Sequence, residues 1–232
     1  MAFTGEHLVA KFFPGTGASY DRVVRWTTWG RDAAWKRSLL AALPPSRRIL
    51  ELAAGTGILT AMLLEAHPGA HVTAVDITDD YQAIARERFA GDGRVDFRLG
   101  DATKVDLPRH PPFDALVTCY LPKYVDPERL LKNVGPALAP GATLILHDFD
   151  KPRAWLPFLL WRAWFGVANL VAPRLHPEWR NVFDRSLLHL ISNARWPHHF
   201  KAALRRHGYL DIRHQRLFFS TARLVIARKP PA

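Results

Sequence analysis

Short apolar runs alternate with helical runs between residues 46 and 150, and this alternation most limits the folds open to the chain. The strand candidates are Arg48–Ala53, His71–Asp76, Val95–Leu99, Ala115–Cys119 and Thr143–His147, and the helix candidates between them are Leu59–Ala66, Tyr81–Ala90 and Pro127–Leu138. A strand that is followed by a helix returns by a right-handed crossover and pairs in parallel with a neighbouring strand. The pattern therefore predicts an α/β protein built on a parallel sheet.

The flanking segments differ in composition from this region, and they divide the chain, which we expect to be a single domain, into four parts. These parts are an N-terminal helical cap (1–45), a core (46–150), an aromatic lid (151–200) and a final helix with a β-hairpin (201–232). The cap ends at Pro44-Pro45, and the lid contains five of the eight tryptophans. In the last part, Ser220-Thr221 separates two strand-like runs. The sheet is therefore expected to end in an antiparallel hairpin.

One stretch of the lid, Ala154–Ala172, is apolar apart from Arg162 and Asn169. It is almost long enough to span a bilayer, but it contains a proline, a glycine and an arginine, which argue against a spanning helix. We expect a buried or interfacial pair of helices instead. Packing in the core is the simplest interpretation, and contact with a membrane or with a lipophilic substrate is the alternative.

A glycine-rich loop joins the first predicted strand to the first predicted helix. The sequence Ile49-Leu50-Glu51-Leu52-Ala53-Ala54-Gly55-Thr56-Gly57 runs from an apolar strand into small residues. Small residues let the backbone turn tightly and come close to a ligand, and the following helix offers free N–H groups. An ordinary strand–helix turn would have the same composition, so the loop alone does not identify a site.

Two aspartates follow the next two predicted strands. Asp76 ends the second strand, about 20 residues after Gly57, which is the spacing at which an acid holds a ribose. Asp101 follows the third strand. Either residue could be a helix N-cap. Together with the glycine loop, however, they place polar groups at the carboxyl edge of the sheet, where open α/β sheets bind ligands, and so they predict a nucleoside-type site.

NAD is the competing ligand for such a site. The dinucleotide fingerprint G-x-G-x-x-G/A is not completed by Gly55-Thr56-Gly57-Ile58-Leu59-Thr60. No second mononucleotide-binding half is predicted after residue 150. The sequence therefore favours a ligand with one nucleoside.

Four segments of the chain resemble class I S-adenosylmethionine (SAM)-dependent methyltransferases. They are Glu51-Leu52-Ala53-Ala54-Gly55-Thr56-Gly57, Ala74-Val75-Asp76-Ile77, Gly100-Asp101-Ala102 and Leu138-Ala139-Pro140-Gly141-Ala142. More narrowly, the chain is similar to the ubiquinone/menaquinone-biosynthesis C-methyltransferases. Two segments carry this similarity: Tyr20-Asp21 followed by Gly30 and Trp35-Lys36, and Asp148-Phe149-Asp150-Lys151-Pro152. The resemblance implies a Rossmann-like, seven-stranded, mostly parallel sheet with a terminal antiparallel hairpin. It also implies methyl transfer to a carbon of a lipophilic quinol-like acceptor.

The same resemblance implies which residues bind SAM and its product, S-adenosylhomocysteine (SAH). They are Glu51, Ala53, Gly55, Thr56, Gly57, Asp76, Ile77, Asp101, Ala102 and Cys119. The resemblance implies no metal ion in the site. The glycine loop would hold the methionine part, with Thr56 among the contacts, and Asp76 the ribose hydroxyls. Ile77 would lie against adenine, whose edge Asp101 and the amide of Ala102 would bind. Cys119 falls where the family has a serine, and a thiol is the weaker hydrogen-bond donor.

The acceptor side departs from the family pattern. Where the family has F-G-L-R-N-V, this chain has Tyr120-Leu121-Pro122-Lys123-Tyr124-Val125, so lysine replaces an arginine that can bind two oxygens at once. Lys123 is the candidate for stabilising an acceptor oxyanion. The candidates for accepting its proton are Tyr20, Tyr124, His147 and Asp148, each of which has a structural alternative.

The chain is strongly basic, with 32 Lys and Arg against 21 Asp and Glu and a formal net charge of +11. A biased genome would explain this charge as well as an anionic partner would. The basic residues are scattered rather than gathered in an arm, so nucleic acid is not favoured. An acceptor with an isoprenoid tail resides in the bilayer, and we therefore expect a cytoplasmic enzyme that visits the inner membrane surface. The aromatic residues expected to line its lid are Phe12, Phe13, Trp155, Phe158, Trp161, Trp164 and Phe165, with Arg153, Arg162 and Arg174 beside them.

Several alternatives stay open. The acceptor could be a phospholipid amine or a small secondary metabolite, and a homodimer is compatible with the sequence. A basic RNA-binding protein or a catalytically idle interaction protein is the alternative of another class. The single cysteine, Cys119, excludes an intrachain disulfide and a multi-cysteine metal cluster, and it fits a reducing compartment.

Overall fold

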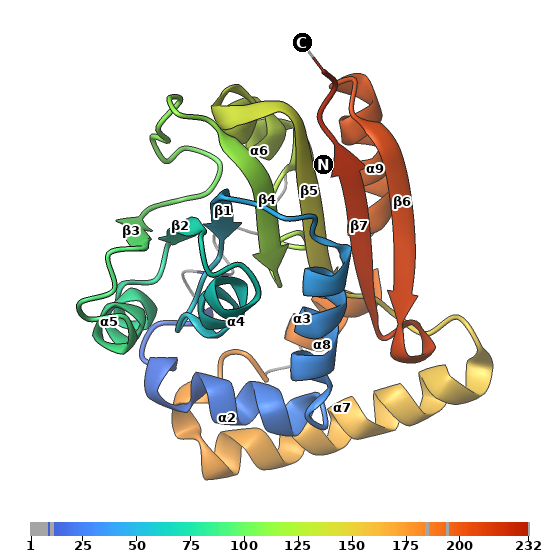
Figure 1. Cartoon of the computed structure of the whole chain (residues 1–232). Helices are drawn as coiled ribbons and strands as arrows, with labels where there is room; N and C mark the ends of the chain where they lie inside the picture. The colour runs from blue at the N-terminus through green and yellow to red at the C-terminus, as the bar shows by residue number, and fades with distance from the viewer. Residues whose placement is uncertain (1–8, 10–11, 184–185, 194, 232) are drawn as a thin grey trace.

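Seven strands form one sheet in the computed structural model of the chain, which describes residues 9, 12–183, 186–193 and 195–231 (Figure 1). Their order across the sheet is β3-β2-β1-β4-β5-β7-β6. The strands are β1 (Arg48–Leu52), β2 (His71–Asp76), β3 (Val95–Leu99), β4 (Phe113–Cys119), β5 (Leu138–Phe149), β6 (Leu210–Leu217) and β7 (Ala222–Arg228). β1 to β5 pair in parallel, whereas β7 runs antiparallel between β5 and β6. The predicted parallel core and terminal hairpin are confirmed.

Helices cover both faces of this sheet. They are α2 (Gly17–Thr27), α3 (Arg31–Ala42), α4 (Ile58–Ala66), α5 (Asp79–Arg88), α6 (Pro127–Val134), α7 (Trp155–Leu175), α8 (Ser186–Asn193) and α9 (Trp196–Arg206). Ile49 of β1 belongs to a buried cluster with residues of α3 and α4. The next residue, Leu50, belongs to a second cluster on the other face, with residues of α6 and α9. Successive strand residues thus face opposite covered surfaces, which explains the unbroken apolar runs in the sequence.

The aromatic stretch of the lid forms one helix, α7, and not the expected pair. Pro157 is its third residue, where the backbone N–H would have no partner inside the helix, so the proline starts the helix instead of breaking it. Trp161, Phe165, Ala168 and Ala172 are buried along one side of α7. The opposite side is exposed, so core packing describes only one face of this helix.

Helix α2 of the N-terminal cap and helix α7 of the lid lie below the carboxyl end of β4 (Figure 1). The start of α2 is held against α5, because the backbone N–H groups of Gly15 and Gly17 donate to Oδ2 of Asp80. Next to them, the hydroxyls of Thr16 and Tyr81 are 2.6 Å apart and form a buried hydrogen bond. These contacts fix α2 across the edge of the sheet at which the polar residues of the sequence were expected to gather.

Candidate functional site

A cavity of about 740 Å³, including its open mouth, lies at the carboxyl ends of β1, β2 and β4 and is here called the edge cavity. It is lined by Val9, Phe13, Tyr20, Ala53, Gly55, Val75, Asp76, Ile77, Thr78, Tyr81, Gly100, Asp101, Ala102, Cys119, Tyr120, Leu121, Tyr124 and Val125. Seven of the ten residues predicted to hold a cofactor are among them. The structure therefore brings the ends of successive strands together as the sequence predicted.

The glycine loop is shaped by left-handed backbone conformations. Gly55 has φ +58° and Gly57 has φ +81°, which lie in a backbone region that residues other than glycine rarely adopt. A Cβ added to Gly57 would also lie 2.8 Å from Cε2 of Phe89, so this position has no room for a side chain. The loop therefore turns directly from β1 into α4 and leaves its backbone at the cavity wall.

Asp76 links the glycine loop to the end of β2. Its Oδ2 accepts a hydrogen bond of 2.7 Å from the N–H of Gly55, and its Oδ1 accepts one of 2.8 Å from the N–H of Thr78. Burial raises the pKa of Asp76, against these hydrogen bonds from Thr78 and Gly55. A carboxylate at this point of the wall can accept hydrogen bonds from two neighbouring hydroxyls of a ligand as well.

The other end of the edge cavity combines an apolar and a charged group. Ile77 is half-exposed in the wall, which gives a flat ring an apolar surface to lie on. Although burial acts to raise the pKa of Asp101, hydrogen bonds from Thr103 and from Lys104 lower it below its usual value. A carboxylate, an apolar surface and a second carboxylate in this order fit the ribose and the base of an adenosine.

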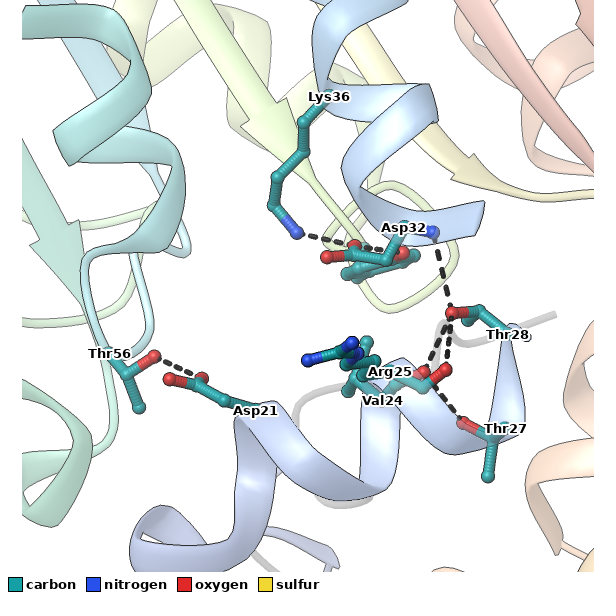
Figure 2. A network of polar contacts seen from close by, with 9 residues as sticks. Asp21, Val24, Arg25, Thr27, Thr28, Asp32, Lys36 and Thr56 are labelled. Carbon is teal, nitrogen blue, oxygen red and sulfur yellow. Dashed lines mark hydrogen bonds and ion pairs between the residues drawn. The ribbon is translucent and has the colours of Figure 1, made fainter. Parts of the chain in front are cut away.

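Three predicted cofactor residues do not line the edge cavity. Glu51 and Thr56 are buried, and Gly57 begins α4. The hydroxyl of Thr56 donates a 2.6 Å hydrogen bond to Oδ1 of Asp21, so it ties the glycine loop to α2 (Figure 2). The expected ligand contact of Thr56 stays a prediction, and in this structure the hydroxyl has its partner in the cap.

A second, inner cavity of about 550 Å³ adjoins the edge cavity, with which it shares Phe13, Tyr20, Tyr120 and Tyr124. Its other lining residues are Val23, Val24, Thr27, Lys123, Phe149, Phe165, Trp179, Val182, Phe183 and Leu187. Among these lining residues, the one with a charged side chain is Lys123. The four shared aromatic residues thus lie between the edge cavity, which has the carboxylates of Asp76 and Asp101 in its wall, and the inner cavity, whose lining is mainly apolar.

The ammonium of Lys123 is already paired at the wall of the inner cavity. It donates a hydrogen bond of 2.8 Å to Oδ1 of Asp148 and one of 2.7 Å to the carbonyl oxygen of Tyr120. It also lies 4.3 Å from the centre of the Tyr124 ring. Burial lowers the pKa of Lys123 and raises that of Asp148, and their ion pair opposes both shifts. The Lys123 amino group is therefore held in one position at the wall of the inner cavity, beside the Asp148 carboxyl group.

The predicted proton acceptors are placed differently from one another. Tyr20 and Tyr124 lie between the two cavities, and burial raises the pKa of both phenols well above the usual range, so they stay protonated and act as donors. His147 lines none of the described cavities. It is fully buried against the Trp35 and Tyr120 rings, and burial lowers its pKa. This position gives no support to the expected role of His147 as a proton acceptor, which stays a prediction.

Sequence reasoning missed a buried carboxylate connected to both cavities. Tyr120 lines both, and its hydroxyl donates 2.6 Å to Oδ1 of Asp32, to which Lys36 is also paired. Figure 2 shows Asp32 at the start of α3, with Thr28 of the preceding turn bound to its backbone N–H. The sequence did offer one indication of Tyr120, though not of Asp32: Tyr120 directly follows the end of β4, much as Asp101 closely follows β3.

Glu51 should make the stability of the ligand-free protein depend on pH. Its Oε1 is buried without a hydrogen-bond partner among the described residues, and burial raises its pKa to about 8. Between its ordinary pKa and about 8, the folded state keeps a proton that the unfolded chain releases, so folding stability falls as the pH rises. Glu51→Gln is therefore expected to gain up to about 1.4 kcal/mol of stability per pH unit over wild type in this window.

Urea unfolding at pH 5, 6, 7 and 8 measures this difference. Glu65→Gln, at an exposed position of α4, is the control and should follow wild type. Parallel pH profiles for Glu51→Gln and wild type would contradict the raised pKa of Glu51.

Comparison with known proteins places these features in a family. Residues 49–141 match the family model that describes a methyltransferase domain. The chain is 36% identical over 148 residues to a demethylmenaquinone methyltransferase of Clavibacter sepedonicus, in an alignment that covers 62% of this chain and 59% of that relative. It is 31% identical over 225 residues to a demethylmenaquinone methyltransferase of Thermus thermophilus, with 91% and 96% covered. The chain thus spans less than two thirds of the first relative and nearly all of the second.

Solved structures show the same fold at low sequence identity. The methyltransferase SibL in its apo form has a TM-score of 0.62 at 17% identity, covering 98% of this chain and 62% of that one. The geranyl diphosphate C-methyltransferase of Streptomyces coelicolor A3(2) also has a TM-score of 0.62, at 13% identity, covering 85% and 79%. The sheet order with its terminal hairpin is therefore the class I methyltransferase fold.

Proposed function

Since the chain belongs to the family of demethylmenaquinone and ubiquinone/menaquinone-biosynthesis C-methyltransferases, we propose that it transfers a methyl group from SAM to a ring carbon of a lipophilic quinol. The observation that carries the acceptor class is the inner cavity: it is walled by apolar and aromatic side chains, and it meets the edge cavity at Tyr20 and Tyr124. A ligand with a polar nucleoside in one cavity can thus meet an apolar ring in the other.

The edge cavity offers a set of groups that fits SAM. Asp76 would hold the ribose hydroxyls, Ile77 would cover one face of adenine, and the backbone of the Gly55 turn would lie against the methionine part. When bound, SAM supplies an electrophilic methyl group on a sulfonium. The task of the protein is then to place a nucleophilic carbon in line with that methyl group and to exclude water.

Residues of the inner cavity would make the ring carbon nucleophilic. A quinol ring carbon gains electron density when the neighbouring hydroxyl loses its proton, and the positive charge of Lys123 at the wall stabilises the resulting oxyanion. Tyr20 and Tyr124 are protonated and can donate hydrogen bonds to an acceptor oxygen. The proton that leaves can pass through the Tyr120 hydroxyl to Asp32, which accepts its hydrogen bond. As the carbon–methyl bond forms, the sulfur–methyl bond breaks and SAH is left. The ring carbon then releases its hydrogen to water as a proton, and the proton held by Asp32 returns through the Tyr120 hydroxyl to the oxygen, which restores the quinol.

The lining of the inner cavity favours this acceptor over an amine. A phospholipid amine is a cation before methylation, and the described lining offers it no free carboxylate, because the Asp148 carboxylate is already paired with Lys123. A turnover assay distinguishes the two: with SAM present, SAH formation is measured with a reduced, short-tailed demethylmenaquinone, with phosphatidylethanolamine and with an RNA oligonucleotide. We expect turnover with the quinol alone. Turnover with the amine or the RNA and none with the quinol would overturn the proposal.

Filling the inner cavity should impair acceptor binding and spare SAH. Leu187 lines this cavity from α8, and Leu187→Trp adds a ring to its space. We expect the KM for the quinol to rise about tenfold or more, because misfit in an apolar pocket costs roughly 1–3 kcal/mol. SAH affinity by calorimetry should stay within about twofold, because Leu187 does not line the edge cavity. His189→Trp, exposed on the same helix, is the control, and an equal change in both variants would contradict this assignment.

A further inference from the structure

The outward side of α7 is an exposed apolar surface, here called the outer face and defined by Trp155, Leu156, Leu159, Leu160, Val167 and Leu170. Trp155 is 76% exposed, Leu159 56% and Leu170 59%, values that are unusual for side chains of this size. Positions 155, 159 and 170 point in similar directions at 100° per residue, so the exposed groups form a stripe along the helix. Neighbouring large apolar side chains that are exposed together mark an interaction site.

The helix carries basic and no acidic residues. Its sequence from Trp155 to Leu175 contains Arg162 and Arg174, both exposed, and neither aspartate nor glutamate. Arg153, also exposed, precedes it. An apolar stripe with arginines at its margins and ends is the composition of helices that lie in the headgroup region of anionic membranes.

The position of α7 excludes a spanning arrangement. Within the described part of the chain, α7 is the helix that has the length and apolar composition to cross a bilayer. Its other side, however, is bound to the protein: Trp161, Phe165 and Ala168 are buried, and the Trp164 indole donates 2.8 Å to the carbonyl of Thr27. Figure 1 shows α7 lying flat along the base of the molecule, below α2 and the β6–β7 turn. A helix held this way can rest on a membrane and cannot cross it.

An apolar groove shares lining residues with the outer face and with the inner cavity. The groove has a volume of about 1010 Å³, including the open space at its mouth, Leu156 and Leu160 of the outer face line it, and none of its lining residues is charged. Thr27, Phe149 and Phe165 also line the inner cavity. At the groove, the Arg31 guanidinium lies 4.1 Å from the centre of the Phe218 ring.

We propose that α7 docks the protein on an anionic lipid bilayer, with its outer face at the boundary between headgroups and acyl chains and the arginines against the headgroups. The groove then opens toward the lipid, and the hydrocarbon part of an acceptor can reach the inner cavity from the membrane. The second statement rests on the proposed function, whereas the docking itself does not.

Flotation with lipid vesicles tests the docking. Vesicles of phosphatidylcholine with about one third phosphatidylglycerol should carry the wild-type protein upward, and less protein should float with pure phosphatidylcholine or at high salt. The variant Leu159→Glu/Leu170→Glu places two charges on the outer face without touching the groove, and its partitioning should fall at least tenfold. Leu210→Glu, at an exposed leucine of β6, is the matched control and should float like wild type.

Activity on two acceptors separates docking from catalysis. Leu159→Glu/Leu170→Glu should turn over a soluble, short-tailed quinol like wild type, but a long-tailed quinol in vesicles at least tenfold more slowly. Wild type that turns over the soluble quinol without floating would overturn the docking and leave the proposed function standing. Wild type that floats but turns over neither quinol would contradict the proposed function alone. A third outcome would also overturn the proposal: the wild-type protein is a dimer that does not float, and the double substitution makes it monomeric. The outer face would then bind a second copy of the chain.

Discussion

Asp76→Ala is expected to weaken SAH binding by roughly 100-fold to 1,000-fold. The substitution removes the acceptor for two hydroxyls of the ligand and leaves the N–H groups of Gly55 and Thr78 without their partner. A hydrogen bond to a charged group contributes about 1.5–3 kcal/mol, and two losses at the lower value, about 3 kcal/mol together, give a change of this size. Isothermal titration calorimetry with SAH measures the effect, and wild type should bind in the micromolar range.

Two further variants show that the carboxylate of Asp76 is responsible. Asp76→Asn keeps one carbonyl oxygen for the glycine loop and should bind SAH with an intermediate affinity. Asp96→Ala, at an exposed position of the neighbouring strand β3, should bind like wild type. If all three variants bound SAH equally, the edge cavity would not be the nucleoside site.

Lys123→Met is expected to destabilise the fold by about 3–5 kcal/mol, because it leaves the Asp148 carboxylate buried without its partner. Both side chains of this pair are almost inaccessible to solvent, so water cannot replace the lost ammonium. The free energy of unfolding from urea titration measures the loss. The double variant Lys123→Met/Asp148→Asn removes the unpaired charge and should recover most of it.

An exposed ion pair provides the comparison. Arg228 and Asp211 are paired at 2.8 Å on β7 and at the start of β6, with more than half of each side chain exposed. Arg228→Met should change the free energy of unfolding by less than about 1 kcal/mol. A loss for Lys123→Met no larger than that for Arg228→Met would show that the Lys123–Asp148 pair does not stabilise the fold.

The sequence predicted the edge cavity because its residues follow a local rule. Asp76 is the last residue of β2 and Asp101 follows β3 after one glycine. In a parallel sheet the ends of neighbouring strands meet, so the proximity of these residues needs no knowledge of distant contacts. The bounds of β2 and β3 agree with the predicted runs for a similar reason: β2 is mostly apolar, β3 alternates apolar and charged residues, and turn residues flank both. The roles of these residues toward SAM remain predictions.

The inner parts of the site depend on packing between distant segments. Asp32 meets Tyr120 across 88 residues, through the way α3 packs on the sheet, and nothing local in the sequence indicates this. His147 and Asp148 are neighbours in β5 and therefore point to opposite faces, which the period of a strand already implied. For α7, the apolar composition was visible, but only the folded chain shows which side is covered.

The most direct test of the account is the position of the transferred methyl group. The protein is incubated with SAM labelled with 13C in its methyl group and with a reduced, short-tailed demethylmenaquinone, and the product is examined by NMR. The account predicts a labelled methyl group on a ring carbon, formed together with one equivalent of SAH. A label on a quinol oxygen, or no labelled quinol from protein that binds SAH, would contradict transfer to carbon in the inner cavity.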